Sequence, residues 1–180
     1  MKWVTRDYVH LDRVASPWLI TRFIDPQAEF VFIPWDGSVA PPADATPFGL
    51  PGAELGPHDA NGTTFQKILA RYALVDPALV RMGRVVACGV DYVLHGYRPS
   101  SDDADGQIAV GLLSISEGTI YRTSDDRAVL AASFPIYDAL YADLQVRQAL
   151  QSDGTRPPAP GRPGPGDKID FLRALYRRIA

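Results

Sequence analysis

The sequence contains three histidines, and each lies close to an acidic residue. The pairs are His10 with Asp12, Glu54 with His58, and Asp91 with His95. Imidazole nitrogens and carboxylate oxygens together are the ligands that zinc, manganese and ferrous iron accept. The residue types therefore suggest a divalent-metal site, and their spacing decides how the chain would have to present it.

Two of these pairs have the same spacing but require different backbones. A Gly-Pro dipeptide between Glu54 and His58 forbids a helix there, so a loop must present both side chains. Asp91 and His95 lie four residues apart, which places them on one face of a helix. Each pair also has a simpler interpretation. Glu54 fits a solvated loop carboxylate, and an imidazolium at His95 suits the C-terminal end of a helix.

An arginine near the first histidine favours anion chemistry. Arg13 lies at a predicted helix start, where acidic residues are usually preferred. The planar fork of a guanidinium matches a carboxylate or another oxyanion, so Arg13 is a candidate for binding substrate, with Asp12 beside it. An ion pair with Asp12 or Asp25 is an equally good explanation. We expect His10 or His95 to transfer a proton in any reaction at this site.

The elements that must position these residues begin with strands around a helix. β-branched and aromatic residues predict a strand from Trp3 to Thr5 that continues through Tyr8 and Val9. A helix follows and ends at Asp25-Pro26. A second strand is expected over 28–34. Residues 35–62 have no helical period, although a short extended piece at 46–50 is possible.

The rest of the chain is predicted to be helical. Thr63 and Gln66 form a capping-box pattern, and Asp76-Pro77 begins a helix that runs to about Leu94. A helix over 107–116 comes next. Ser124 is expected to cap a helix that reaches about Leu150, either kinked near 131–132 by Pro135 or divided into two helices there.

These elements indicate one α/β (α+β) domain, rich in helix with a small β-sheet, that spans residues 1–153. Five prolines and four glycines mark a linker over 154–166. Residues 167–180 form a short apolar-striped helix, which must pack to be stable, either on its own body or on a second subunit. We slightly prefer exchange between subunits, which makes a homodimer the expected assembly.

Composition narrows the class of protein. The 180 residues are 46% hydrophobic and 22% charged, with one cysteine and therefore no internal disulfide. Neither a secretory signal nor an apolar run of membrane-spanning length is visible, so we expect a cytoplasmic protein without a membrane partner. Residues 154–180 contain six basic and two acidic residues and carry +4, which leaves −7 on the remainder. Nucleic-acid contact is not expected from so acidic a body.

Several motifs in this order resemble the ChrB-type domain of chromate-resistance proteins. They are His10-x-Asp12-Arg13, Trp18–Ile20, Arg22–Pro26, Glu54 with His58, Thr64-Phe65, Asp76–Leu79 and Tyr137–Tyr141. The resemblance covers residues 3 to about 145. It implies a mostly helical α/β domain associated with chromate resistance, in a family whose full-length members act in chromate sensing.

The resemblance also implies a divalent metal bound at Glu54, His58 and Asp91, with His10, Asp12 and Arg13 nearby. The family tends to show His-Asp-Ile-Asp where this chain has Cys88-Gly89-Val90-Asp91, and His95 one turn later is a candidate replacement.

Two functional hypotheses follow. The first is an enzyme that depends on manganese, iron or zinc and acts as a lyase, hydrolase or isomerase on a small oxygenated anion. The second is a non-catalytic module that senses chromate or a metal.

Overall fold

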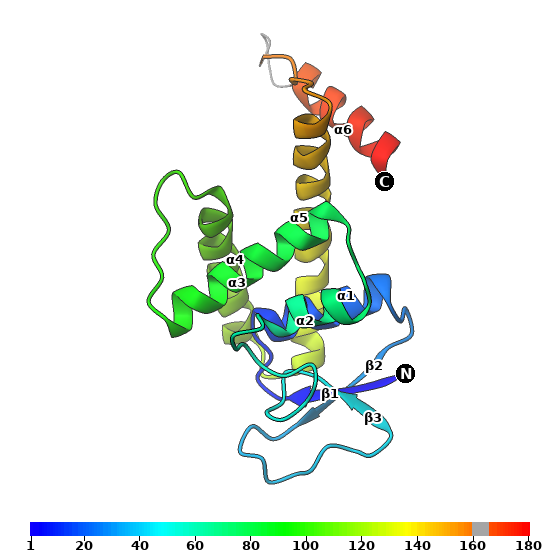
Figure 1. Ribbon diagram of the computed structural model, residues 1–180, viewed down its shortest axis with the longest axis vertical. Coiled ribbons are helices and arrows are strands. Elements are labelled where there is room, and N and C mark those ends of the chain that lie inside the picture. The colour runs from blue at the N-terminus through cyan, green and yellow to red at the C-terminus, as the bar shows by residue number, and fades with distance from the viewer. Residues whose placement is uncertain (160–165) are drawn as a thin grey trace.

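The computed structural model describes residues 1–159 and 166–180, which form six helices and one three-stranded sheet (Figure 1). In chain order the elements are β1 (Lys2–Arg6), α1 (Asp12–Phe23), β2 (Glu29–Ile33), β3 (Ala45–Pro47), α2 (Thr64–Arg71), α3 (Pro77–Leu94), α4 (Ala104–Arg122), α5 (Asp126–Ser152) and α6 (Gly166–Ile179). The predicted fold class, a helix-rich α/β domain with a small sheet, is confirmed.

All three strands of the sheet run parallel, in the order β2-β1-β3. The central strand β1 therefore pairs on both sides, and Trp3 lies opposite Phe30 in β2 and Thr46 in β3. Figure 1 shows the sheet at one end of the molecule, beside α1 and α2. Because parallel strands end at the same edge, the residues that follow the three strands converge there.

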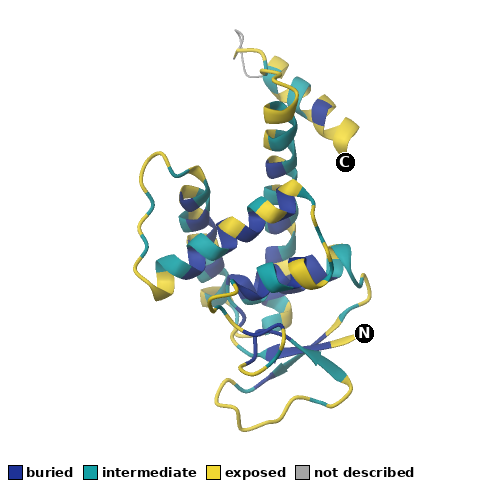
Figure 2. Cartoon of the chain, in the orientation of Figure 1, coloured by how far each residue is buried: buried dark blue, intermediate teal, exposed yellow. Residues whose placement is uncertain are grey.

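The hydrophobic core lies between the sheet and the helices and is organised around α1. Most of α1 from Val14 to Ile20 is buried, and α1 contacts α2, α3 and α5. Figure 2 shows the corresponding buried stripes on the surrounding helices. The fully buried Trp18 packs against Tyr137, at 6.0 Å between ring centroids, and against Tyr141, at 5.8 Å. A helix that is apolar around most of its circumference is typical of a buried core element.

Two predicted helix starts are confirmed in atomic detail. The Thr63 hydroxyl accepts from the backbone N–H of Gln66 at 3.2 Å, and the Gln66 side chain accepts from the N–H of Thr63 at 3.0 Å. At α3, the Asp76 carboxylate accepts from the N–H groups of Ala78 and Leu79. At the N-terminal ends of α2 and α3, side chains therefore accept hydrogen bonds from backbone N–H groups that have no partner within the helix.

Some predicted boundaries are wrong. β1 ends at Arg6 rather than continuing to Val9, because Tyr8 adopts a left-handed conformation with φ 55°. The helix predicted over 107–116 is longer, since Asp103 caps it and it runs over Ala104–Arg122. Asp125 rather than Ser124 caps α5, which continues as one helix through Pro135.

The C-terminal helix α6 packs along α5 within the single chain (Figure 1). Its Leu175 is buried, whereas Ile169 and Tyr176 stay partly exposed. Residues 154–159 of the predicted linker form no helix or strand, and 160–165 lie outside the described residues. Exchange of α6 between two subunits stays a prediction. Within the described ranges, no helix combines the length and the apolar character needed to cross a membrane.

Candidate metal and anion site

A cavity of about 190 Å³ opens at the carboxyl edge of the sheet. Arg6 ends β1, while Trp35 and Gly49 follow β2 and β3, and all three line the cavity. The remaining walls come from the segment around α1, the loop before α2 and the end of α3; they are His10, Leu11, Asp12, Arg13, Pro57, His58, Thr64, Val90, Val93 and Leu94. The volume is below the ~300 Å³ at which typical small-molecule sites begin, which favours a small ligand.

Two histidines and one aspartate meet at this cavity. Asp91 and His95 lie one turn apart at the end of α3, and His58 approaches them from the loop before α2. His58 Nε2 lies 3.4 Å from Asp91 Oδ1, and His95 Nε2 lies 4.0 Å from the same oxygen. One ligand atom from each residue lies within 4.8 Å of the other two.

This cluster fits a divalent metal in ligand type and number. Two imidazoles and one carboxylate form a set that zinc and ferrous iron accept, and three protein ligands leave positions open for a small molecule. His58 Nδ1 is buried and has no hydrogen-bond partner among the described residues. The nitrogen close to Asp91 is Nε2, so a metal held by Nε2 would leave Nδ1 available for a hydrogen bond outside the cluster.

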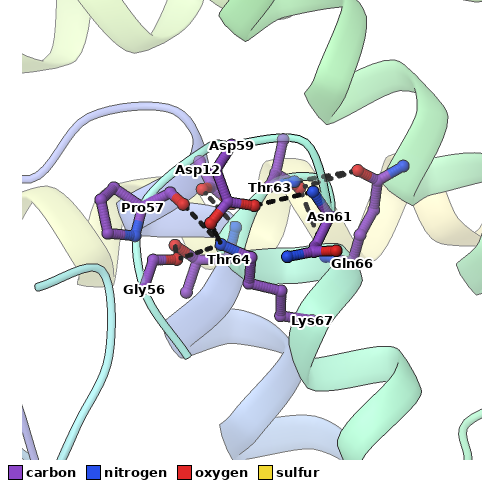
Figure 3. Close-up of polar contacts among 9 residues, drawn as sticks. All are labelled: Asp12, Gly56, Pro57, Asp59, Asn61, Thr63, Thr64, Gln66 and Lys67. Carbon is purple, nitrogen blue, oxygen red and sulfur yellow. Dashed lines mark hydrogen bonds and ion pairs between the residues drawn. The ribbon is translucent and has the colours of Figure 1, made fainter. Parts of the chain in front are cut away.

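The loop that carries His58 is fastened to α2 by several hydrogen bonds (Figure 3). Lys67 Nζ donates to the carbonyl of Pro57 at 2.6 Å and to Asp59 Oδ2 at 2.8 Å. The Thr64 hydroxyl donates to the carbonyl of Gly56 at 2.9 Å. These contacts fix the backbone on both sides of His58, so the imidazole is held in place before any ligand binds.

Asp12 connects α1 to the start of α2. Its Oδ2 accepts from the backbone N–H of Thr64 at 2.9 Å (Figure 3). Its Oδ1 accepts from the N–H of Phe65 at 3.0 Å. The Ser16 hydroxyl donates to Oδ1 as well, at 3.3 Å. Burial raises the pKa of the Asp12 carboxyl, and these hydrogen bonds oppose that change. Both carboxylate oxygens therefore already have protein partners.

The Arg13 side chain contacts the segment that joins β1 to α1. Its Nη1 donates to the carbonyls of Arg6, at 3.2 Å, and Asp7, at 2.7 Å, and its Nη2 donates to the carbonyl of Tyr8 at 2.9 Å. Burial lowers the pKa of Arg13 to about 10, which still leaves the guanidinium charged at neutral pH. Arg13 is thus bound to backbone carbonyls rather than to Asp12 or Asp25.

Long-range contacts also hold the segment that presents His10. Asp126 at the start of α5 accepts from the N–H groups of Tyr8 and Val9. The N–H of Leu11 donates to the Ser116 hydroxyl, and its carbonyl accepts from Tyr137. Leu11, like Tyr8, has a positive φ, so the surrounding contacts maintain a backbone that non-glycine residues rarely adopt.

His10 itself faces the cavity with an unused nitrogen. Its Nε2 is buried and has no hydrogen-bond partner among the residues described. Burial lowers the pKa of His10; Arg13 adds to this effect and Glu117 opposes it. The imidazole is therefore neutral at pH 7 and can accept a proton or a hydrogen bond.

The structure places six of the seven predicted site residues around one cavity and leaves Glu54 elsewhere. The cavity is lined by His10, Asp12, Arg13 and His58, and Asp91 and His95 adjoin it through the cluster with His58. The Glu54 side chain is 75% exposed and pairs with Arg71 at 3.1 Å. His95, predicted either to transfer a proton or to replace a missing ligand, lies in the cluster with His58 and Asp91.

Sequence reasoning missed three residues at this site. Arg6 and Trp35 line the cavity, and Lys67 fastens the His58 loop. A charged residue directly after an apolar strand is the signal that points to Arg6, because the ends of parallel strands form ligand sites. Lys67 had no signal in the sequence, since two of its partners are backbone carbonyls and the third, Asp59, precedes it by eight residues in an irregular loop.

Fold and site together define a helix-rich α/β domain with a candidate metal and anion site at the edge of its sheet. A family model described as ChrB, C-terminal domain, matches residues 3–144, so the chain belongs to this family. Protein ChrB of Cupriavidus metallidurans is 32% identical over 142 residues, which cover 78% of this chain and 40% of that protein. No solved structure matches the chain. The resemblance inferred from the motifs is confirmed.

Proposed function

We propose that this ChrB-family domain binds a divalent metal and is an enzyme, a lyase, hydrolase or isomerase, that acts on a small oxygenated anion. The observation that carries the proposal is the convergence of His58, Asp91 and His95 beside a small cavity that contains two arginines and a neutral histidine. Family membership supports a role associated with chromate resistance.

In this proposal His58, Asp91 and His95 hold the metal and Glu54 does not, since its carboxylate is exposed and paired with Arg71. A metal bound there would polarise a carbonyl group or activate water. The three ligands come from one helix end and one fastened loop, so the chain needs little rearrangement to bind it.

The remaining polar residues divide into two roles. His10 accepts a proton through Nε2, which has no hydrogen-bond partner within the described ranges. Arg13 and Asp12, predicted as substrate-binding residues, act instead as positioning residues. Arg13 holds the backbone before His10, and Asp12 holds the start of α2 behind the His58 loop.

The alternative is a binding module that senses chromate or a metal without chemistry, and family membership is compatible with it. Such a module would use the same three ligands and the same cavity but would not need His10 as a proton acceptor. The two candidates therefore share a metal site and differ at His10.

The first experiment is metal analysis by mass spectrometry on protein purified without an affinity tag. We expect about one metal ion per chain in the wild type, and loss of the ion in His58→Ala and in Asp91→Ala. Glu54→Ala is the matched control, because it removes a nearby carboxylate that lies outside the cluster, and it should keep the metal. A wild type that stays metal-free after addition of manganese, iron or zinc would exclude the proposal.

A second experiment separates the enzyme from the sensor. Metal-loaded protein is incubated with a panel of small oxygenated anions, and both binding and product formation are followed. In an enzyme, His10→Gln keeps affinity and loses turnover. Binding without turnover in the wild type and in every variant identifies the sensor.

A further inference from the structure

We propose that Arg6 and Trp35 form an oxyanion-binding subsite at the sheet edge of the cavity, and that Arg6 rather than Arg13 contacts the anion. This inference deepens the proposed function, because it names the residues that would hold the anionic group. It uses no metal ligand, so it can be tested on metal-free protein.

Three of the five N–H donors of Arg13 are used by the backbone. Its two terminal nitrogens already donate to three backbone carbonyls at 2.7–3.2 Å. Its positive charge is also balanced by carboxylates nearby, since Asp126, Asp12 and Asp7 all stabilise the charged form. An anion that bound to Arg13 through Nη1 would have to displace hydrogen bonds that hold the backbone before His10.

Arg6 differs from Arg13 in its hydrogen bonds and in its ion pairs. Its backbone carbonyl accepts from Arg13, but no hydrogen bond or ion pair of its guanidinium occurs among the described residues. The side chain is half-buried in the wall of the cavity. A guanidinium offers several N–H donors in a planar fork, which fits two oxygens of a carboxylate or of a tetrahedral oxyanion.

Trp35 fixes the orientation of this free guanidinium. The Cζ atom of Arg6 lies 4.8 Å from the centroid of the Trp35 ring, and that of Arg13 lies 4.5 Å from it. One indole therefore contacts two guanidinium groups, within the range of cation–π attraction. The charge of Arg6 disfavours the charged form of Arg13, so the two cations repel each other and a bound anion would relieve this repulsion.

The cavity restricts the anion to a small one. Its volume of about 190 Å³ is below the ~300 Å³ at which typical small-molecule sites begin. Val90, Val93 and Leu94 form an apolar wall, and His10 Nε2 supplies one more polar contact. The expected ligand class is a small oxyanion. A planar carboxylate such as oxalate and a tetrahedral ion such as sulfate share the chemistry that Arg6 recognises.

The test uses Trp35 as its reporter. Trp3 and Trp18 are fully buried, whereas Trp35 is 51% exposed, so changes in tryptophan fluorescence on ligand binding report chiefly on the subsite. The full chain, stripped of metal with a chelator, is titrated with oxalate and separately with sulfate at constant ionic strength. Isothermal titration calorimetry provides a second readout that does not depend on tryptophan.

We expect saturable binding of at least one of the two anions to the wild type, and at least tenfold weaker binding to Arg6→Gln. Arg6→Lys, which keeps the charge and loses the fork, should be intermediate. Arg122→Gln is the control, since it removes the same charge from an exposed position outside the cavity and should match the wild type.

Three results would overturn the subsite: no binding of either anion to the wild type, equal affinity in Arg6→Gln and the wild type, or equal weakening in Arg122→Gln. A preference for oxalate over sulfate would assign a carboxylate ligand, and the reverse a tetrahedral one. Anion binding by a protein that takes up no metal would uphold the subsite and refute the metal site, so the two proposals fail separately.

Discussion

Asp12 and Asp91 lie in neighbouring parts of the site, yet their surroundings are opposite. Asp12 is buried and accepts three hydrogen bonds, two of them from the start of α2. The Asp91 side chain is 40% exposed, and two histidine nitrogens lie 3.4 and 4.0 Å from its Oδ1. One carboxylate is fully used by the fold, and the other still has capacity for a ligand.

This difference separates residues that build the site from residues that act in it. A buried carboxylate costs free energy unless the protein satisfies it, so Asp12 must serve the structure. An exposed carboxylate costs little, so Asp91 can remain available between two imidazoles. The same division separates Arg13, which gives three of its five N–H donors to the backbone, from Arg6, whose guanidinium has no hydrogen bond among the described residues.

The strongest test of the comparison is the stability of Asp12→Ala. Removal of the carboxylate leaves the N–H groups of Thr64 and Phe65 buried without partners, at ~1–3 kcal/mol each, so we expect a loss of about 3 kcal/mol. Urea denaturation of metal-free protein provides the measurement. Asp91→Ala is the matched control and should change the free energy of unfolding by less than ~0.5 kcal/mol. Similar losses of stability in both variants would contradict the division between residues that build the site and residues that act in it.

Metal addition should make Asp91 important for stability as well. A metal that binds only the folded chain stabilises it by ~2.7 kcal/mol when its free concentration is 100 times Kd, which corresponds to a rise of roughly 5–10 °C in Tm. Thermal denaturation with and without manganese or zinc measures this shift. We expect the shift in the wild type and in Glu54→Ala, and none in Asp91→Ala. A shift that survives in Asp91→Ala would place the metal elsewhere.

Asp138 extends the comparison of Asp12 with Asp91, because it is partly exposed and yet its carboxylate accepts hydrogen bonds from the protein. It accepts from Arg22 at two positions, each at 2.8 Å, and from Trp18 Nε1 at 2.7 Å, which joins α5 to α1. Asp138→Ala should cost ~1–2 kcal/mol in urea denaturation. The control Asp143→Ala removes only an exposed pair on the same helix and should cost ~0.3–0.5 kcal/mol.

The Asp138 effect should depend on pH. The hydrogen bond from Arg22 is the main cause that lowers the pKa of Asp138, so its stabilising contribution is complete above the unfolded pKa of ~3.9 and is lost as the pH falls further. The difference between wild type and Asp138→Ala should therefore shrink in acid. A constant difference down to the lowest accessible pH would show that packing, not charge, carries the effect.

The smallest expected effect concerns His10. Burial lowers its pKa in the folded chain, so the unfolded chain takes up a proton first as the pH falls below ~6.5. The stability of metal-free wild type should therefore decline from that pH toward the lower folded pKa, and His10→Gln should show a shallower decline. Urea denaturation at several pH values measures both slopes. Identical slopes would mean that His10 is as accessible to protons in the folded chain as in the unfolded one.

Local signals in the sequence predicted much of the fold. The starts of α2 and α3 were predictable because each depends on residues within three positions, Thr63 with Gln66 and Asp76 with Pro77. The end of β1 was not, because the left-handed conformation of Tyr8 is maintained by Asp126, 118 residues away. The start of α4 was missed because its first turn is polar and only the Asp103 cap marks it.

The site was predictable in residue type but not in arrangement. Helical spacing alone brought Asp91 and His95 together, and the family resemblance implied His58 as a partner of Asp91. The sequence could not show that the same loop turns Glu54 away toward Arg71. Nor could it show the convergence of Arg6 and Trp35, since this depends on the order in which three strands pair.

The contacts that hold the segment before α1 also determine when the site can form during synthesis. Synthesis up to residue 95 supplies His10, His58, Asp91 and His95. The hydrogen-bond partners of Val9 and Leu11 are made later, since they are Asp126 and Tyr137. A nascent chain therefore contains these four residues before it contains the contacts that hold the segment before α1 in place. We expect a chain truncated at residue 124 to bind no anion at Arg6, although it contains all the residues of the subsite.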